Sequence, residues 1–327
     1  MRLKMRKFAR NRYFVNDQQG LALILVLLIL MLLTALASEL AFSTRTEYNL
    51  TSNSIQEKQA YFIALAGYQM ALAQIMTEYD YVYRDNEGNL VFANRGSGKE
   101  SRTLRAAGFD IPLGPGIFSY WITDEDSKIN INAIKRNKLH LLLEETGIEG
   151  SQRDNLADSI LDWRDADTVP RLKGAEDDYY RGLPQPYESK DGSFDTIEEL
   201  LLVKGVTPEI FYGSKSAEDG QGYRGISQFL TVQPRGVNRN TAEEIVLKVA
   251  FGEEKAERIV SQRSTKNGVF RDRDTSKSFT IIATGQINNT PIRRAIKAIV
   301  TKEVTRQEQR VKIIYWNDNY LSGGVSF

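Results

Sequence analysis

The hydrophobic pattern of the chain opens with one continuous apolar run near the N-terminus. From Leu21 to Ala37 only Thr34 is polar, which gives seventeen nearly uniform positions. As a helix these residues span about 26 Å, at about 1.5 Å each. The hydrocarbon core of a bilayer is about 30 Å thick, so adding the residues up to Phe42 gives a helix long enough to cross it. The pattern therefore predicts a membrane-spanning helix.

Beyond this run the pattern becomes that of an amphipathic helix. There is no proline before Pro112 and no glycine between Gly20 and Gly67, so we expect one helix to continue to about Tyr79, about 85 Å in all. The apolar stripe expected to dock on a domain comprises Ile55, Phe62, Leu65, Leu72 and Met76. The small residues expected to allow close lateral approach of partner helices are Ala60, Ala64 and Ala71.

Strand patterns appear only later in the chain. Phe118, Tyr120 and Ile122 alternate with smaller or polar residues. Residues 278–303 give two runs around a turn at Asn288 and Asn289, which predicts a hairpin. The run VKIIYW, 311–316, is a candidate final strand. About 140 mainly helical residues separate these regions, so we predict an α+β fold, in which a long N-terminal helix packs on a small antiparallel sheet with a large helical insert.

The predicted organisation has five parts. Residues 1–20 form a leader, 21–80 the long helix, 105–130 with 268–316 the sheet, 131–267 the inserted helical domain, and 317–327 a flexible tail.

The insert contains a short repeat and a candidate helical hairpin. Asparagines two apart, Asn130 with Asn132 and Asn238 with Asn240, are expected to cap following helices. In 197–211, a glycine turn and Thr207 before a proline predict helix-hairpin-helix or SAM-like units, which elsewhere bind DNA phosphates. From 153 to 199, however, thirteen acidic residues face six basic ones, a balance that repels a polyphosphate. A structural hairpin is favoured, and no nucleic acid is expected as a partner.

Composition limits the chemistry available to the chain. The absence of cysteine excludes disulfides and thiolate metal sites, and the formal charge is only +1. His140 is the only histidine and fits a helix face, and neither a G-x-S-x-G elbow nor a phosphate-binding loop is present. We therefore expect a structural component rather than an enzyme, although an exported enzyme is a further alternative.

The most specific segment is the acidic stretch at 161–187. Oxygen ligands on a loop with proline and glycine suit calcium better than zinc, and the order of residues is not that of an EF-hand. The alternative is a solvated acidic loop. The candidate metal ligands are Asp162, Asp165, Asp167, Glu176, Asp177 and Asp178.

The N-terminus resembles the type IV prepilin family, in which a prepilin peptidase cuts after glycine and methylates the new amino terminus. Six basic residues precede Gly20, against the single acid Asp17: Arg2, Lys4, Arg6, Lys7, Arg10 and Arg12. They mark a cytoplasmic flank. The resemblance implies cleavage between Gly20 and Leu21. Two alternatives are an uncleaved anchor and an ordinary signal peptide cut after Ala37. Prepilins usually carry glutamate at the fifth mature position, where this chain has Leu25.

Further motifs resemble the minor pseudopilin K family of type II secretion systems. They are DWRDAD (162–167), GAEDDYY (174–180), PQPY (184–187), ELLLVKGVTPEIF (199–211) and VNRNTAEE (237–244). The resemblance implies a fibre-tip protein of the inner membrane with a periplasmic body. The implied partners are pseudopilins I and J, and bound calcium is also implied. The alternative function is that of a membrane-tethered, DNA-binding pilin-like protein.

Overall fold

The computed structural model describes residues 17–85, 87–94, 103–214, 222–233, 236–265, 268–271, 274–304 and 309–320. The basic leader residues, Arg2 to Arg12, and most of the predicted tail lie outside these ranges. The chain divides into two compact units, residues 1–58 and 59–327.

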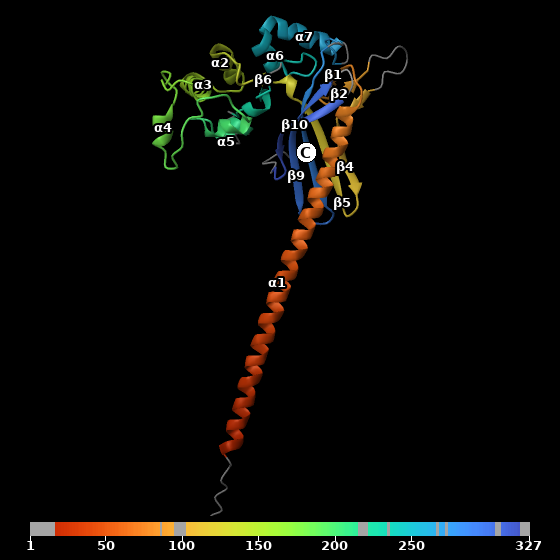
Figure 1. Cartoon of the computed structure of the whole chain (residues 1–327), viewed down its shortest axis with the longest axis vertical. Helices are drawn as coiled ribbons and strands as arrows, with labels where there is room; N and C mark the ends of the chain where they lie inside the picture. Colours follow the sequence, from red (N-terminus) through yellow and green to blue (C-terminus); the bar gives the residue numbers. More distant parts are fainter. Residues whose placement is uncertain are drawn as a thin grey trace, which may run out of the picture. The chain divides into compact units, whose positions relative to one another are not determined.

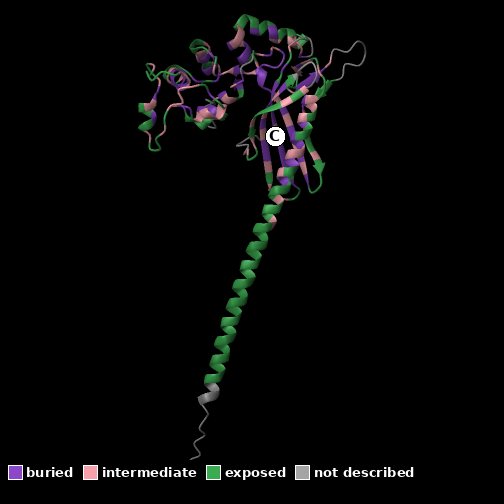
Figure 2. Cartoon of the chain, in the orientation of Figure 1, coloured by how far each residue is buried: buried purple, intermediate pink, exposed green. Residues whose placement is uncertain are grey.

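The first unit consists of the N-terminal part of helix α1, which runs over Asp17–Met76. An 18-residue window of this helix has a mean hydropathy of 3.0, and none of the window is buried (Figure 2). By length and composition the helix is able to cross a membrane, although an N-terminal signal sequence shares these properties. The predicted continuous helix is confirmed, and its end lies three residues before Tyr79.

The second unit contains the end of α1 and a five-stranded antiparallel sheet of order β10-β9-β8-β5-β4 (Figure 1). The strands are β4 (Ala107–Leu113), β5 (Gly116–Asp124), β8 (Ser278–Ile287), β9 (Arg293–Val304) and β10 (Gln309–Asn317). Phe118, Tyr120 and Ile122 of β5 are buried, as their alternation predicts. The predicted hairpin and final strand are also confirmed, and Asn289 turns the hairpin with a φ of 59°.

The predicted docking stripe on α1 is only partly right, since Leu65 and Leu72 pack against the core of the second unit. Phe62 is 64% exposed, whereas Ala60, Ala64 and Ala71 are fully buried. A Cβ added to Gly285 of β8 would clash with the carbonyl oxygen of Ala60, so helix and sheet approach too closely for larger side chains at this contact. The three alanines therefore pack on the chain's own sheet and do not serve a partner helix.

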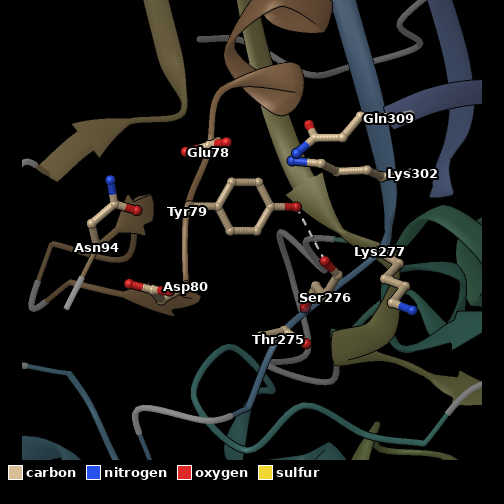
Figure 3. Close-up of a pocket in the computed structure, with 9 residues that line it drawn as sticks. All are labelled: Glu78, Tyr79, Asp80, Asn94, Thr275, Ser276, Lys277, Lys302 and Gln309. Carbon is tan, nitrogen blue, oxygen red and sulfur yellow. Dashed lines mark hydrogen bonds between the residues drawn. The ribbon is translucent and has the colours of Figure 1, made fainter. Parts of the chain in front are cut away.

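A three-stranded sheet that the sequence pattern did not indicate follows α1. It consists of β1 (Tyr81–Arg84), β2 (Leu90–Ala93) and β3 (Thr103–Arg105). Near its start a cavity of about 480 Å³ is lined by Tyr79, Lys277 and Lys302 among others. Figure 3 shows Tyr79 in this cavity, where its hydroxyl donates to the carbonyl oxygen of Ser276 at 3.2 Å.

Between β5 and β8 the chain is mainly helical and has its own core. Its helices are α2 (Arg136–Glu145), α3 (Gly150–Arg164), α4 (Asp177–Arg181), α5 (Pro208–Tyr212), α6 (Glu244–Phe251) and α7 (Glu253–Thr265). Short 3-10 turns are η1 (Glu125–Ser127), η2 (Ile197–Leu202) and η3 (Ile226–Phe229), and β6 (Ile129–Asn130) pairs in parallel with β7 (Leu230–Thr231). Leu139, Leu156, Ile160 and Phe229 are fully buried in this core. The α+β class is thus confirmed, while the predicted domain boundaries stay predictions.

The two asparagine pairs do not cap helices, because Lys135 and Glu243 occupy the N-cap positions of α2 and α6. Each pair instead makes the same local turn: Asn130 Oδ1 accepts from the Asn132 backbone N–H at 2.8 Å, and Asn238 Oδ1 from that of Asn240 at 2.9 Å. The second asparagine of each pair then bonds a distant backbone segment. Asn132 binds the backbone of Phe194, and Asn240 binds those of Phe270 and Arg271.

The predicted hairpin at 197–211 forms with one difference. Its first element, η2, is a 3-10 helix, and Gly205 turns the chain with a φ of 84°. Helix α5 begins at Pro208 behind Thr207, whose hydroxyl accepts from the Ile210 N–H at 3.4 Å. The assignment to a helix-hairpin-helix family stays a prediction.

Candidate functional site

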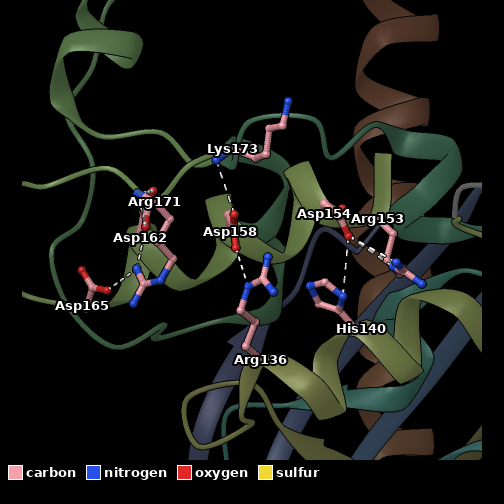
Figure 4. Close-up of polar contacts among 9 residues, drawn as sticks. All are labelled: Arg136, His140, Arg153, Asp154, Asp158, Asp162, Asp165, Arg171 and Lys173. Atoms are coloured by element: carbon pink, nitrogen blue, oxygen red, sulfur yellow. Dashed lines mark hydrogen bonds and ion pairs between the residues drawn. The ribbon is translucent and has the colours of Figure 1, made fainter. Parts of the chain in front are cut away.

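The candidate site is built along one face of α3, where three aspartates recur every four residues (Figure 4). A four-residue spacing places side chains on the same side of a helix. Asp154 Oδ1 lies 3.6 Å from His140 Nδ1, and burial lowers the pKa of that histidine. Asp158, only 3% exposed, accepts from Arg136 Nε at 2.7 Å. The predicted position of His140 on a helix is confirmed.

Asp162, the third aspartate, is completely buried and is held by Arg171. Arg171 Nη1 lies 2.5 Å from Asp162 Oδ1 and 2.5 Å from Asp165 Oδ2, so one guanidinium ties the end of α3 to the loop that follows. A Cβ at Gly174 would clash with Asp162 Oδ2. Glycine is therefore required at this position for the loop to close over the carboxylate.

Three of the predicted ligands meet in this loop. Carboxylate oxygens of Asp165, Asp167 and Glu176 all lie within 4.8 Å of one another. Each residue also has an oxygen engaged with the protein: Asp165 with Arg171, Asp167 with the N–H of Val169 at 3.0 Å, and Glu176 with Ser189 Oγ at 3.3 Å. The loop thus brings carboxylate oxygens of three residues close to one another.

Two oxygens in this cluster are buried without a hydrogen-bond partner, Asp165 Oδ1 and Glu176 Oε1. Buried polar atoms normally have partners, because an unsatisfied one costs about 1–3 kcal/mol. Burial, together with the nearby Asp162 carboxylate, raises the pKa of Glu176 to about 7. A bound cation would pair with the two unpartnered oxygens and would favour the ionised form of Glu176. The residues present therefore fit an ion with oxygen ligands.

Not all six predicted ligands belong to this cluster. Asp177 accepts from the Ser189 N–H at 2.8 Å and pairs with Arg181 at 2.8 Å, while Asp178 is exposed on α4. Asp162 is occupied by Arg171. Three supporting residues were not predicted from the sequence, namely Arg171, Gly174 and Ser189, although Gly174 begins the GAEDDYY motif.

The processing residues, Gly20 and Leu21, lie within α1. Leu21 is 69% exposed. The cleavage between them stays a prediction.

Comparisons with known proteins address the body of the chain. A sequence model described as type II secretion system (T2SS), protein K, matches residues 122–213, which hold the acidic cluster and the hairpin. The type II secretion system protein K of Pectobacterium carotovorum is 28% identical over 213 residues, covering 60% of this chain and 61% of that protein. Over its matched part the chain is thus similar to type II secretion system protein K.

Two further comparisons cover more of the chain. The protein K of Pseudomonas aeruginosa is 26% identical over 279 residues, covering 81% of this chain and 78% of that protein. A crystal structure of the GspK-GspI-GspJ complex from enterotoxigenic Escherichia coli matches with a TM-score of 0.51 and 13% identity, covering 85% of this chain and 99% of that chain. This likeness confirms the fold. The match to the Pectobacterium protein spans about three fifths of that protein's length.

Proposed function

We propose that the chain is a minor pseudopilin at the tip of the type II secretion pseudopilus, where it initiates or caps the fibre that drives protein export. The similarity of residues 122–213 and of the longer matched region to type II secretion system protein K carries this proposal. Leu25 supports the tip position, because a repeating shaft subunit needs a carboxylate there to pair with its neighbour's amino terminus. The role is one of assembly and needs no catalytic site.

The apolar helix fits an inner-membrane anchor. We infer that a prepilin peptidase cuts after Gly20 and methylates Leu21, with the leader cytoplasmic and the body periplasmic. Expression with a prepilin peptidase, followed by mass spectrometry of the mature N-terminus, tests this. A methylated Leu21 is expected. A mature chain starting at Ser38 would mean that the apolar run is a discarded signal peptide, and the tip role would fall with it.

The proposed partners are pseudopilins I and J, because the matching crystal structure is that of a GspK-GspI-GspJ complex. Within the second unit, Phe62 of α1 is 64% exposed and is available for contact with a partner. Mixing the full chain with pseudopilins I and J in detergent should give a complex, and Phe62→Ala should weaken it about tenfold. Phe109→Ala is the matched control, because Phe109 is 57% exposed on β4. The absence of any complex would count against the proposal.

Calcium is the proposed ion for the acidic cluster. Asp165, Asp167 and Glu176 would hold it, since hard divalent cations take carboxylate oxygens. When bound, the ion supplies positive charge that links the end of α3 to the start of α4. Its role is then to fix the shape of the inserted domain.

A further inference from the structure

The inserted helical domain joins the five-stranded sheet at one root, where the chain leaves β5 and returns to β8. Asp124, at the end of β5, accepts from the hydroxyls of Thr241 and Ser276 at 2.5 Å each and from Asn238 Nδ2 at 3.3 Å. Asp126 Oδ2 accepts from the Lys277 N–H at 2.8 Å. These buried hydrogen bonds hold together the two segments that connect the insert to the sheet, one after β5 and one before β8.

Away from the root the two bodies are separated by a cleft of about 370 Å³. The insert lines it with Glu198, Tyr212 and Thr231, and the sheet lines it with Ile282, Lys297 and Tyr315. Protein interiors are close-packed and rarely leave such a space. The insert and the sheet therefore meet here without the interdigitated packing that would fix their angle.

An ion pair between described residues crosses this cleft. Lys297 Nζ of β9 lies 2.7 Å from Glu198 Oε1 of η2, and the two side chains are 20% and 35% exposed. The rings of Tyr315 and Tyr320 lie 5.7 and 5.4 Å from the ammonium group, distances at which aromatic faces attract a cation. The two rings hold the Lys297 ammonium group on the sheet side, and the Glu198 carboxylate binds it from the insert side.

Glu198 has no capping role in its own helix. The capping box of η2 uses the Thr196 side chain and Glu199, which leaves Glu198 for the contact with Lys297. At 20% and 35% exposure the pair is mostly shielded from water, so it is stronger than a fully exposed pair, yet both groups are close enough to solvent to be rehydrated when they separate. It is suited to holding two bodies together and releasing them.

We propose that Glu198 and Lys297 form a latch that holds the inserted domain closed over the sheet, and that the insert pivots about the Asp124 root when the latch opens. Opening exposes the cleft face of the sheet. The latch is a property of this fold and does not depend on the proposed role at the fibre tip.

Because the chain contains no cysteine, a thiol-specific spin label will react only with cysteines that are introduced for the experiment. Two exposed positions, Glu209 on α5 and Gln286 on β8, are changed to cysteine and spin-labelled in the full chain in detergent micelles. Pulsed electron paramagnetic resonance then gives the distribution of distances between insert and sheet. The distribution for the otherwise unchanged chain should have one narrow peak.

Breaking the latch from either side should broaden that peak. Lys297→Met keeps the aliphatic stem, and Glu198→Gln keeps the shape of the carboxylate; each should raise the ratio of open to closed molecules about tenfold. The double variant should be no broader than either single variant, because both remove the same interaction. Arg258→Met is the control, since Arg258 pairs with Glu254 at 3.0 Å on the surface of α7.

Three results would overturn the latch. One is an unchanged narrow peak in both single variants. Another is broadening in the double variant equal to the sum of the two single effects, which would indicate independent local damage. The third is equal broadening in the Arg258→Met control, which would show that the motion is unrelated to the cleft.

Discussion

The ammonium group of Lys302, on β9, donates a hydrogen bond of 2.9 Å to the carbonyl oxygen of Ile75, in the last turn of α1. It also donates to the carbonyl oxygen of Thr77 at 3.1 Å and lies 4.2 Å from the centre of the Tyr79 ring (Figure 3). The last carbonyls of a helix have no partner within it, and a cation there also meets the negative end of the helix dipole. Lys302 therefore fastens the end of the long helix to the sheet.

Lys302→Met should lower the free energy of unfolding by about 1–3 kcal/mol, because it leaves two carbonyls without their donor and removes the cation from the Tyr79 ring. Thermal unfolding of the full chain in non-denaturing detergent measures this. Lys312→Met is the control, since Lys312 is exposed on β10. Equal melting temperatures for Lys302→Met and the unchanged chain would mean that water satisfies the helix end.

Arg171 gives a second stability prediction. Arg171→Leu leaves the fully buried Asp162 without its cation, and breaking a buried pair from one side costs about 3 kcal/mol or more. The same melting experiment should show a large loss. Adding Asp162→Asn to the variant should recover part of it, because the uncompensated charge is then gone.

The control for Arg171→Leu is Arg181→Leu, whose exposed pair with Glu188 should matter little. If both arginine variants melt alike, the Asp162 contact is not the source of the loss.

Calcium should stabilise the chain if the acidic cluster binds it. At a concentration a hundredfold above the dissociation constant, the melting temperature should rise by about 5–10 °C, and a chelator should reverse the rise. Glu176→Gln should abolish the shift, whereas Asp178→Asn should keep it, since Asp178 lies outside the cluster. An equal shift in Glu176→Gln would place the ion elsewhere.

Local patterns in the sequence predicted local structure well. The alternation of Phe118, Tyr120 and Ile122 identified β5, and Thr207 before Pro208 marked the start of α5. Both signals act within a few residues, so the sequence contains all that they require. The clustering of Asp165, Asp167 and Glu176 followed for the same reason, because one short loop holds all three.

Features that depend on distant partners could not be predicted. The face by which α1 packs is set by Gly285, far along the chain, and not by the hydrophobicity of the helix alone. The repeated asparagines were recognised, but Asn132 and Asn240 bond the backbones of Phe194 and Phe270, which no local rule indicates. The Glu198–Lys297 contact joins residues 99 positions apart and needs the fold to be known.

The buried root of the inserted domain makes stability depend on pH. Burial, and the neighbouring Asp126 carboxylate, raise the pKa of Asp124 from 3.8 to about 7 despite the hydroxyl groups that donate to it. In the folded chain Asp124 therefore keeps its proton over a range in which the unfolded chain has lost it. This contribution to stability is fully present below about pH 4 and is lost as the pH rises to about 7.

The size of the effect follows from linkage. Between pH 5 and 7 the folded state holds about one more proton at this site than the unfolded state, which lowers the free energy of unfolding by about 2 kcal/mol over that range. Asp124→Asn removes the titration and keeps a side chain of the same shape. Melting temperatures measured from pH 5 to 8 for both chains give two profiles, and their difference isolates Asp124 from every other group. That difference should grow steadily in favour of the variant up to about pH 7 and then level off. Parallel profiles would show that the hydrogen-bond donors around Asp124, among them Thr241, Ser276 and Asn238, keep it ionised in the folded chain.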